Sequence, residues 1–184
     1  NVVNVIDTVQ IKEDIAKAKQ KADLTVLTIH WGVEYELKGN EIQTQLAQLF
    51  VREGVDLVIG GHPHVVQDAE FMHIDSSSVT VFYSLGNSVS NQRKTDTNGG
   101  IMVNVKIGVR SKKIINSTYL PVYVHRGVLN NKYQFHLIPT IDFIKSPASF
   151  PIPAADSVAL LTFDKRTRER LSNISVFDKG LTFN

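Results

Sequence analysis

Two short apolar runs, LTVLTI at residues 24–29 and DLVIG at residues 56–60, constrain the fold of this 184-residue chain more than any other feature. Both are rich in β-branched residues with little polar alternation, which is typical of strands covered on both faces. A polar loop and a helical pattern that starts near Glu41 and stops near Gly54 separate them. This spacing predicts two parallel strands joined by a right-handed crossover.

The same pattern extends towards the start of the chain. Residues 2–6 predict a short strand, and Asp7 and Thr8 can cap a helix that follows. The apolar positions of that helix recur at steps of four, three and four residues. Three strands separated by two helical patterns predict a mainly parallel sheet in the first part of the chain.

Beyond about residue 65 the pattern becomes one of short strands joined by polar turns. Residues 67–74 and 79–85 predict two strands, and residues 101–109 alternate strictly between apolar and polar positions. Residues 114–124 and 133–138 continue in the same style, so we expect antiparallel strands with one face in water. A proline-containing connector and a charged helix near residues 163–174 follow.

Composition excludes several classes of function. Hydrophobic residues make up 42% and charged residues 21%, as in ordinary soluble proteins, and the net charge of +2 is too small and diffuse to indicate nucleic-acid binding. No apolar run approaches the roughly 18 residues of a membrane-spanning helix, and there is no cysteine for disulfides or thiolate sites. Dinucleotide-binding, Walker A and serine-hydrolase signatures are also absent from the sequence.

Three of the six histidines directly follow the two apolar runs. His30 follows the first, and His62 and His64 follow the second in the stretch GGHPH. Because ligands of open α/β sheets bind outside the carboxyl ends of the strands, we expect these rings to share one crevice. Pro63 biases His62 towards an extended backbone and stiffens the separation of the two rings.

Such a cluster indicates a site for a metal or a phosphate group. Neutral imidazole is a ligand for Zn, Mn, Fe, Co or Ni, and a bound metal requires rigidly held ligands. The other three histidines, His73, His125 and His136, lie inside strand-like segments without ligand-like neighbours in sequence. We predict no functional role for them.

The histidine stretch also resembles a known family. GGHPH is similar to the Gly-His-x-His signature of the calcineurin-like metallophosphoesterases. The motifs HWGVEYE, HPHVVQ and YSLGN occur in the order typical of a narrower group, the CapA-like proteins linked to poly-γ-glutamate capsule synthesis. The resemblance covers about residues 6–109 and implies the C-terminal part of a four-layer α/β/β/α fold. It places residues 1–145 in that domain and leaves residues 146–184 as a connector and helical tail.

The resemblance assigns candidate site residues. It implies that His30, His62 and His64 are ligands of a divalent-metal site that holds two ions in the complete protein, Mn, Fe or Zn. Two such metals polarise a phosphoryl group and generate a hydroxide nucleophile. Possible pocket-lining residues are Trp31, Glu34, Tyr35, Tyr83, Ser84 and Asn87. Glu34 and Tyr35 serve equally well as anchors of their loop.

One departure from the family pattern concerns the remaining ligands. The parent fold takes an Asp, a bridging acidic residue and an Asn-His pair from upstream motifs, and no Asn-His or Gly-Asp pair occurs here. Family members also commonly have Phe at the position of Ser88. We therefore expect this chain to be the C-terminal portion of a longer protein and to be catalytically incompetent by itself.

Two functions follow from the resemblance. The first is a metal-dependent phosphoesterase-type hydrolase or transferase of capsule synthesis, which acts on a phosphate- or glutamate-bearing anion once its missing half is present. The second is a non-catalytic accessory protein that binds an anionic polymer or a membrane partner. Both favour the bacterial cell envelope or an extracytoplasmic location over the cytoplasm.

Overall fold

The fold was described from a computed structural model in which residues 5–74 and 77–177 are placed. Helices and strands alternate in the first part, and strands dominate the second. The elements are α1 (Thr8–Lys19), β1 (Val26–His30), α2 (Glu41–Arg52), β2 (Leu57–Gly61), β3 (Ala69–Ile74), β4 (Ser77–Phe82), β5 (Gly99–Ile107), β6 (Ile114–Leu129), β7 (Lys132–Pro139), α3 (Thr140–Lys145), a 3-10 turn (Pro147–Ser149), α4 (Ala154–Arg170) and β8 (Ser175–Val176).

The first sheet has the strand order β1-β2-β4-β3. β1, β2 and β4 run parallel, and β3 pairs antiparallel with β4. Asp7 caps α1 as expected, because it accepts hydrogen bonds from two backbone amides of that helix. The structure adds a capping box of Asn40 and Gln43 at the start of α2. Gly54 ends α2 with a φ of +88°, a conformation that glycine adopts without strain.

The second sheet is built from β5, β6 and β7 in antiparallel order, with β8 parallel to β6. Ile101 and Val103 face the core, whereas Met102 on the opposite face of β5 is 44% exposed. The expected order of parallel strands first and antiparallel strands afterwards is therefore confirmed.

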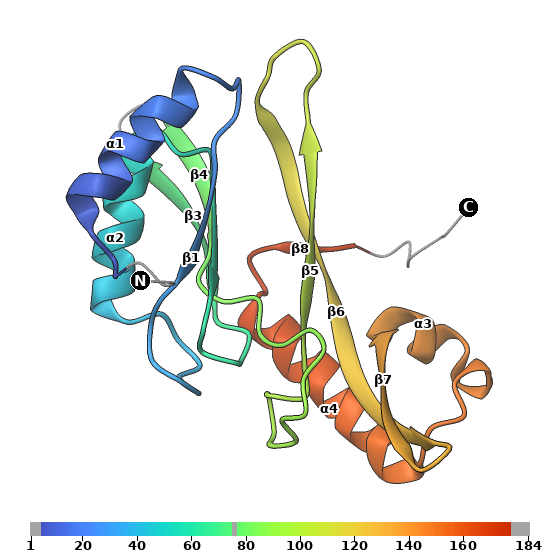
Figure 1. The fold of residues 1–184 in the computed structure, drawn as a ribbon. Helices are drawn as coiled ribbons and strands as arrows, with labels where there is room; N and C mark the ends of the chain where they lie inside the picture. Colours follow the sequence, from blue (N-terminus) through green and yellow to red (C-terminus); the bar gives the residue numbers. More distant parts are fainter. Residues whose placement is uncertain (1–4, 75–76, 178–184) are drawn as a thin grey trace.

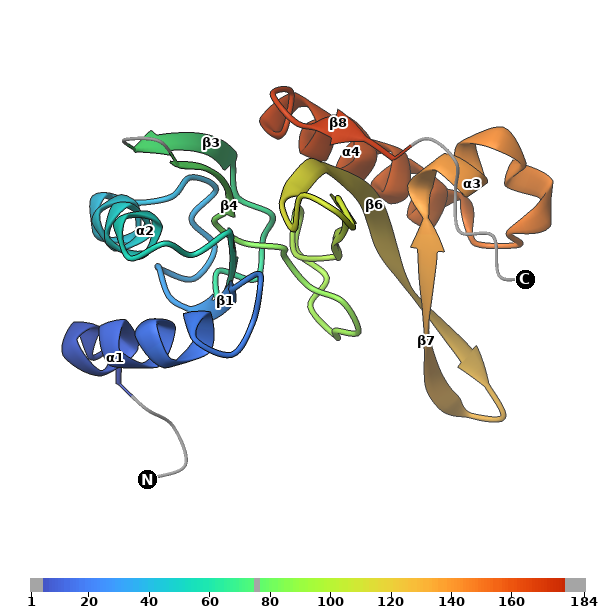
Figure 2. The same cartoon turned by 90° about the horizontal axis from the view of Figure 1, so that it is seen from above.

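Four layers are visible when the molecule is seen from above (Figure 2). α1 and α2 cover one face of the first sheet, the second sheet lies on the other side of it, and α3 and α4 pack against β6 (Figure 1). One apolar cluster contains Trp31, Phe50 and Val81 and fills the space between α2 and the first sheet. The other contains Phe82, Tyr119 and Phe163 and joins both sheets to α4. Burial of both faces of the first sheet explains its continuous apolar strands.

Three expectations differ from the observed elements. Val5 and Ile6 lie outside any strand, and the rest of the strand expected at residues 2–6 lies outside the described residues. The strands expected at 67–74 and 79–85 belong to the first sheet rather than the second, because β4 inserts beside β2. The charged helix is also longer than expected, since α4 begins at Ala154.

Among the described residues no helix has the length and apolar character required to cross a membrane.

Candidate functional site

The three candidate histidines lie together at one edge of the first sheet. His30 ends β1 beside Gly61 of β2, and His62 and His64 follow at once. The ring centroids of His30 and His62 are 4.5 Å apart, and those of His62 and His64 are 6.2 Å apart. We call these three residues the histidine edge.

The histidine edge suits a divalent metal in chemistry but not in number. Imidazole nitrogens are common ligands of first-row metals. Within residues 5–74 and 77–177, however, no group of three or more His, Cys, Asp or Glu side chains is arranged to hold one ion. The chemistry of the imidazoles thus suits a divalent metal, but the described residues do not form a closed set of ligands for one.

The backbone of the histidine edge is strained. His62 has a φ of +99° and His64 a φ of +60°, values that non-glycine residues rarely adopt. The extended conformation expected for His62 ahead of Pro63 is thus wrong. The chain turns back directly after β2, and the carbonyl oxygen of Pro63 accepts a hydrogen bond of 2.8 Å from the amide of Tyr35, which holds the turn in place. Such conformations cost about 1–3 kcal/mol each and are often found at functional sites.

Glu34 and Tyr35 flank His64. The Oε1 atom of Glu34 lies 3.8 Å from Nε2 of His64, and the Tyr35 ring stacks at a centroid distance of 6.1 Å from the His64 ring. The ammonium group of Lys94 lies 5.2 Å from the centre of the Tyr35 ring. Lys94 is exposed and lies over the aromatic ring that stacks on His64.

Two buried amide side chains hold the loop that carries Glu34 and Tyr35. Nε2 of Gln67 donates to the carbonyl oxygens of Glu36 and Lys38, both at 2.9 Å, and Nε2 of Gln43 donates to Oε1 of Gln67, also at 2.9 Å. Gln43 and Gln67 are each 1% exposed. The last residue of the HPHVVQ motif thus anchors the loop of the HWGVEYE motif, which connects the two motifs physically.

Trp31 and Tyr83 lie beneath the histidine edge rather than in a crevice. Trp31 is 3% exposed, stacks between Phe50 and Tyr83, and donates from Nε1 to the carbonyl oxygen of Tyr83 at 2.8 Å. The Tyr83 hydroxyl donates to Glu70 at 2.9 Å. Burial, opposed by a hydrogen bond from Thr44 and reinforced by Glu70, raises the pKa of Tyr83 to about 12. Gly60 allows this close packing, since a Cβ there would collide with the Tyr83 carbonyl oxygen and with Trp31.

Ser84 and Asn87 follow β4 next to the same edge. Ser84 is 1% exposed, and its hydroxyl oxygen accepts a hydrogen bond of 3.2 Å from the amide of Gly86. Asn87 is 9% exposed and bonds to His64 through its side chain. Of the six candidate lining residues, Glu34, Tyr35 and Asn87 are thus brought next to His64.

The other three histidines, His73, His125 and His136, lie away from the histidine edge. His73 lies on β3, on the exposed side. His125 and His136 are cross-strand partners on β6 and β7, and Nδ1 of His125 lies 2.6 Å from Oδ2 of Asp156 in α4. The sequence pattern missed this carboxylate neighbour because it is 31 residues away along the chain.

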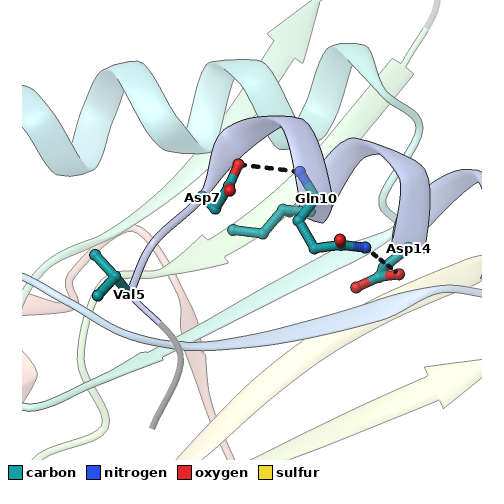
Figure 3. A pocket seen from close by; sticks show the side chains of 5 residues that line it. Val5, Asp7, Gln10 and Asp14 are labelled. Atoms are coloured by element: carbon teal, nitrogen blue, oxygen red, sulfur yellow. Dashed lines mark hydrogen bonds between the residues drawn. The ribbon is translucent and has the colours of Figure 1, made fainter. Parts of the chain in front are cut away.

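Several cavities in the part of the chain that the structure describes lie away from the histidine edge. A cavity of about 480 Å³ at the start of α1 is lined by Val5, Asp7, Gln10, Ile11 and Asp14 (Figure 3). Its carboxylates already have partners, because Asp7 caps α1 and Asp14 accepts from the Gln10 amide and pairs with Lys17.

Sequence reasoning missed the supporting residues Gln43 and Lys94. Each lies in a helix or loop whose pattern carries no chemical signature, and only the three-dimensional fold brings them close to the motifs. Gln67 was within the HPHVVQ motif, so its position could have indicated a role.

Comparison with known proteins gives a consistent result. The family model described as "Bacterial capsule synthesis protein PGA_cap" matches residues 1–92, half of the chain. The chain is 39% identical over 89 residues to "PGA biosynthesis protein CapA" of Bacillus subtilis (strain 168), which covers 48% of this chain and 22% of that protein. It is 34% identical over 119 residues to "Capsule biosynthesis protein CapA" of Bacillus anthracis, which covers 62% of this chain and 28% of that protein. The matches thus span less than a third of either relative.

Proposed function

Because this chain belongs to the bacterial capsule synthesis family PGA_cap, we propose that it serves poly-γ-glutamate capsule synthesis as part of a metallophosphoesterase-type metal site. His30, His62 and His64 are the ligands that it contributes. The observation that carries the proposal is the gathering of three imidazoles at the carboxyl ends of two parallel strands, two of them on strained backbone.

The state of β1 supports a site completed by further protein. β1 pairs only with β2 among the described strands, and it therefore presents a free edge. The side chains of Val26, Thr28 and His30 on one of its faces are exposed, Val26 by 52%. A longer protein can cover this edge and bring carboxylate ligands next to His30, as the family resemblance implies.

The chemistry expected of the complete site is phosphoryl or related group transfer. When bound, divalent metals would supply Lewis acidity and an activated water. The residues of this chain would hold neutral imidazole lone pairs in fixed directions, and Lys94 beside Tyr35 would attract the anionic part of a substrate. That substrate is a phosphate- or glutamate-bearing anion.

Metal content tests this proposal. A longer form with its natural upstream sequence, incubated with Mn²⁺ or Zn²⁺ and measured by mass spectrometry, is expected to retain about two ions per chain. His62→Ala and His64→Ala should each lower that content, and the matched control His73→Ala should leave it unchanged. A longer form that stays free of metal would contradict the proposal.

A non-catalytic accessory role is the second candidate, and the lack of a closed ligand set within the described residues favours it. In that case the exposed Lys94 and the free edge of β1 would serve to bind an anionic polymer. Binding of poly-γ-glutamate by a longer form without metal and without turnover of phosphate esters would support this role. Turnover that depends on metal and on His64 would exclude it.

A further inference from the structure

The side-chain amide of Asn87 has only one orientation that satisfies its neighbours. Its Nδ2 atom donates to two backbone carbonyl oxygens, that of Thr97 at 2.8 Å and that of His64 at 3.1 Å. A carbonyl oxygen cannot donate, so the nitrogen of the amide must occupy this side. The Oδ1 atom of Asn87 therefore faces the His64 ring, where it lies 3.0 Å from Nδ1.

This orientation determines the protonation of the neighbouring ring. Oδ1 of an amide is only an acceptor, so Nδ1 of His64 must carry the hydrogen of that bond. In the neutral ring the lone pair is then on Nε2. We propose that Asn87 is a positioning residue, which fixes His64 as the Nδ1–H tautomer and directs the Nε2 lone pair out of the protein surface towards Glu34.

In this tautomer the Nε2 lone pair of His64 can bind a cation. Nε2 of His64 and Oε1 of Glu34 are 3.8 Å apart, too far for a hydrogen bond. In this tautomer both atoms present lone pairs to the space between them, and that space suits a cation. The inference rests on the proposed function, because a metal ion is the cation that this site would hold. Hydrogen bonds to the second nitrogen of a ligating histidine commonly fix its tautomer in metal sites.

An ion pair between a buried carboxylate and a partly exposed arginine holds Thr97, the second partner of Asn87, in place. Thr97 follows Asp96, which is 5% exposed and has a φ of +66°. Asp96 accepts two hydrogen bonds from Arg166 of α4, at 3.0 Å from Nε and 2.7 Å from a terminal nitrogen. Arg170 lies 3.5 Å from Asp96 and also donates to the carbonyl oxygen of Val66 at 2.9 Å. α4, far along the chain, thereby secures the loop whose carbonyl orients Asn87.

Nitrogen NMR of the histidine rings tests the tautomer without any metal. In a mildly alkaline buffer, where imidazole rings are neutral, His64 should show a protonated Nδ1 and an unprotonated Nε2. The His64→Gln variant assigns the signals. A protonated Nε2 on His64 in the unsubstituted chain would overturn the proposal.

Two substitutions separate positioning from mere packing. Asn87→Asp loses both donations to the backbone carbonyl oxygens but keeps an acceptor for Nδ1–H, so it should retain the Nδ1–H tautomer. Asn87→Leu has a similar volume without an acceptor and should give a mixture of tautomers. An Asn87→Leu spectrum unchanged at His64 would contradict the proposal. If the Leu variant does not fold, the spectra of the unsubstituted chain and of Asn87→Asp still show whether His64 carries its hydrogen on Nδ1.

Metal affinity gives the second readout, on a longer form with its natural upstream sequence. Asn87→Leu should weaken Mn²⁺ binding about 10- to 100-fold, and Asn87→Asp, which keeps only the acceptor for Nδ1–H, should weaken it less. Equal affinity of the Leu variant and the unsubstituted protein would overturn the positioning role. If the ring carries the expected tautomer but the longer form binds no metal, the proposed function fails and the placement of the ring by Asn87 stands.

Discussion

His64 and His125 both bond through Nδ1, yet they lie in opposite kinds of surroundings. His64 sits in a turn with a φ of +60°, has a neutral amide as its partner, and its side chain is 33% exposed. His125 sits in the long strand β6, has a carboxylate as its partner, and its side chain is 13% exposed. The histidine edge is thus built on strained backbone and leaves nitrogen lone pairs accessible. The His125–Asp156 pair ties β6 to α4 in a regular and mostly buried place.

The chemistry of an imidazole depends on the group that is hydrogen-bonded to its Nδ1 atom. A carboxylate at 2.6 Å makes a charge-assisted bond that stabilises the fold. An amide fixes direction without adding charge, and it leaves the opposite nitrogen for an external ligand. Two of the three residues of the histidine edge, His62 and His64, have a positive φ, and strained backbone of this kind is often found at functional sites.

The largest effect should come from the packing beneath the histidine edge. Gly60→Ala places a Cβ against the Tyr83 carbonyl oxygen and Trp31, so we expect it to lower the free energy of unfolding by more than about 3 kcal/mol. Gly61→Ala is the matched control, because nothing lies within 4 Å of its added Cβ. Urea unfolding of both variants measures the difference. Equal stabilities would show that the histidine edge is less tightly packed than described.

The next effect concerns alkaline pH. Because the pKa of Tyr83 is raised to about 12, its neutral phenol stabilises the fold fully below about pH 10, and this contribution is lost as the pH rises towards 12. The loss amounts to roughly 2–3 kcal/mol. The free energy of unfolding, measured at increasing pH between about 10 and 12, should therefore fall less for Tyr83→Phe than for the unsubstituted chain. The control is Tyr133→Phe, since Tyr133 is 63% exposed.

A slightly smaller loss of folding stability is expected when the His125–Asp156 pair is broken. Asp156→Asn retains the shape of the side chain and removes the charge that His125 bonds to, and it should cost about 2 kcal/mol. Glu169→Gln on the same helix breaks only an exposed pair with Lys165 and should cost less than about 0.5 kcal/mol. Thermal unfolding compares the two. The metal content of the longer form should be unaffected by Asp156→Asn. A loss of metal in this variant would mean that the His125–Asp156 pair also contributes to metal binding.

The smallest effect tests backbone strain directly. At His62, whose φ is +99°, glycine should be more stable than alanine by about 1 kcal/mol, because glycine lacks the Cβ that opposes this conformation. At His30, within β1, the order should reverse by roughly 0.5–1 kcal/mol. Denaturant unfolding of the four variants provides the measurement. Alanine as stable as glycine at position 62 would mean that the turn carries no strain.

Local sequence patterns determined the elements and their order. Apolar runs of β-branched residues became β1 and β2, Asp7 and Asn40 capped the helices that followed them, and Gly54 ended α2. The position of β4 beside β2 could not be deduced in the same way. Its alternation is compatible with either sheet, and the choice depends on which apolar faces can be buried together.

The sequence by itself determined that this is an α/β chain of the capsule synthesis family, with His30, His62 and His64 after two neighbouring strands. Periodicity and short motifs report residues that are close along the chain. Only the tertiary structure decided that Asn87 orients His64, that Gln67 anchors the loop of Glu34, and that Asp96 ties its own loop to α4. Those contacts join residues 23 to 70 positions apart, and such pairs are brought together by the packing of both sheets rather than by any local pattern.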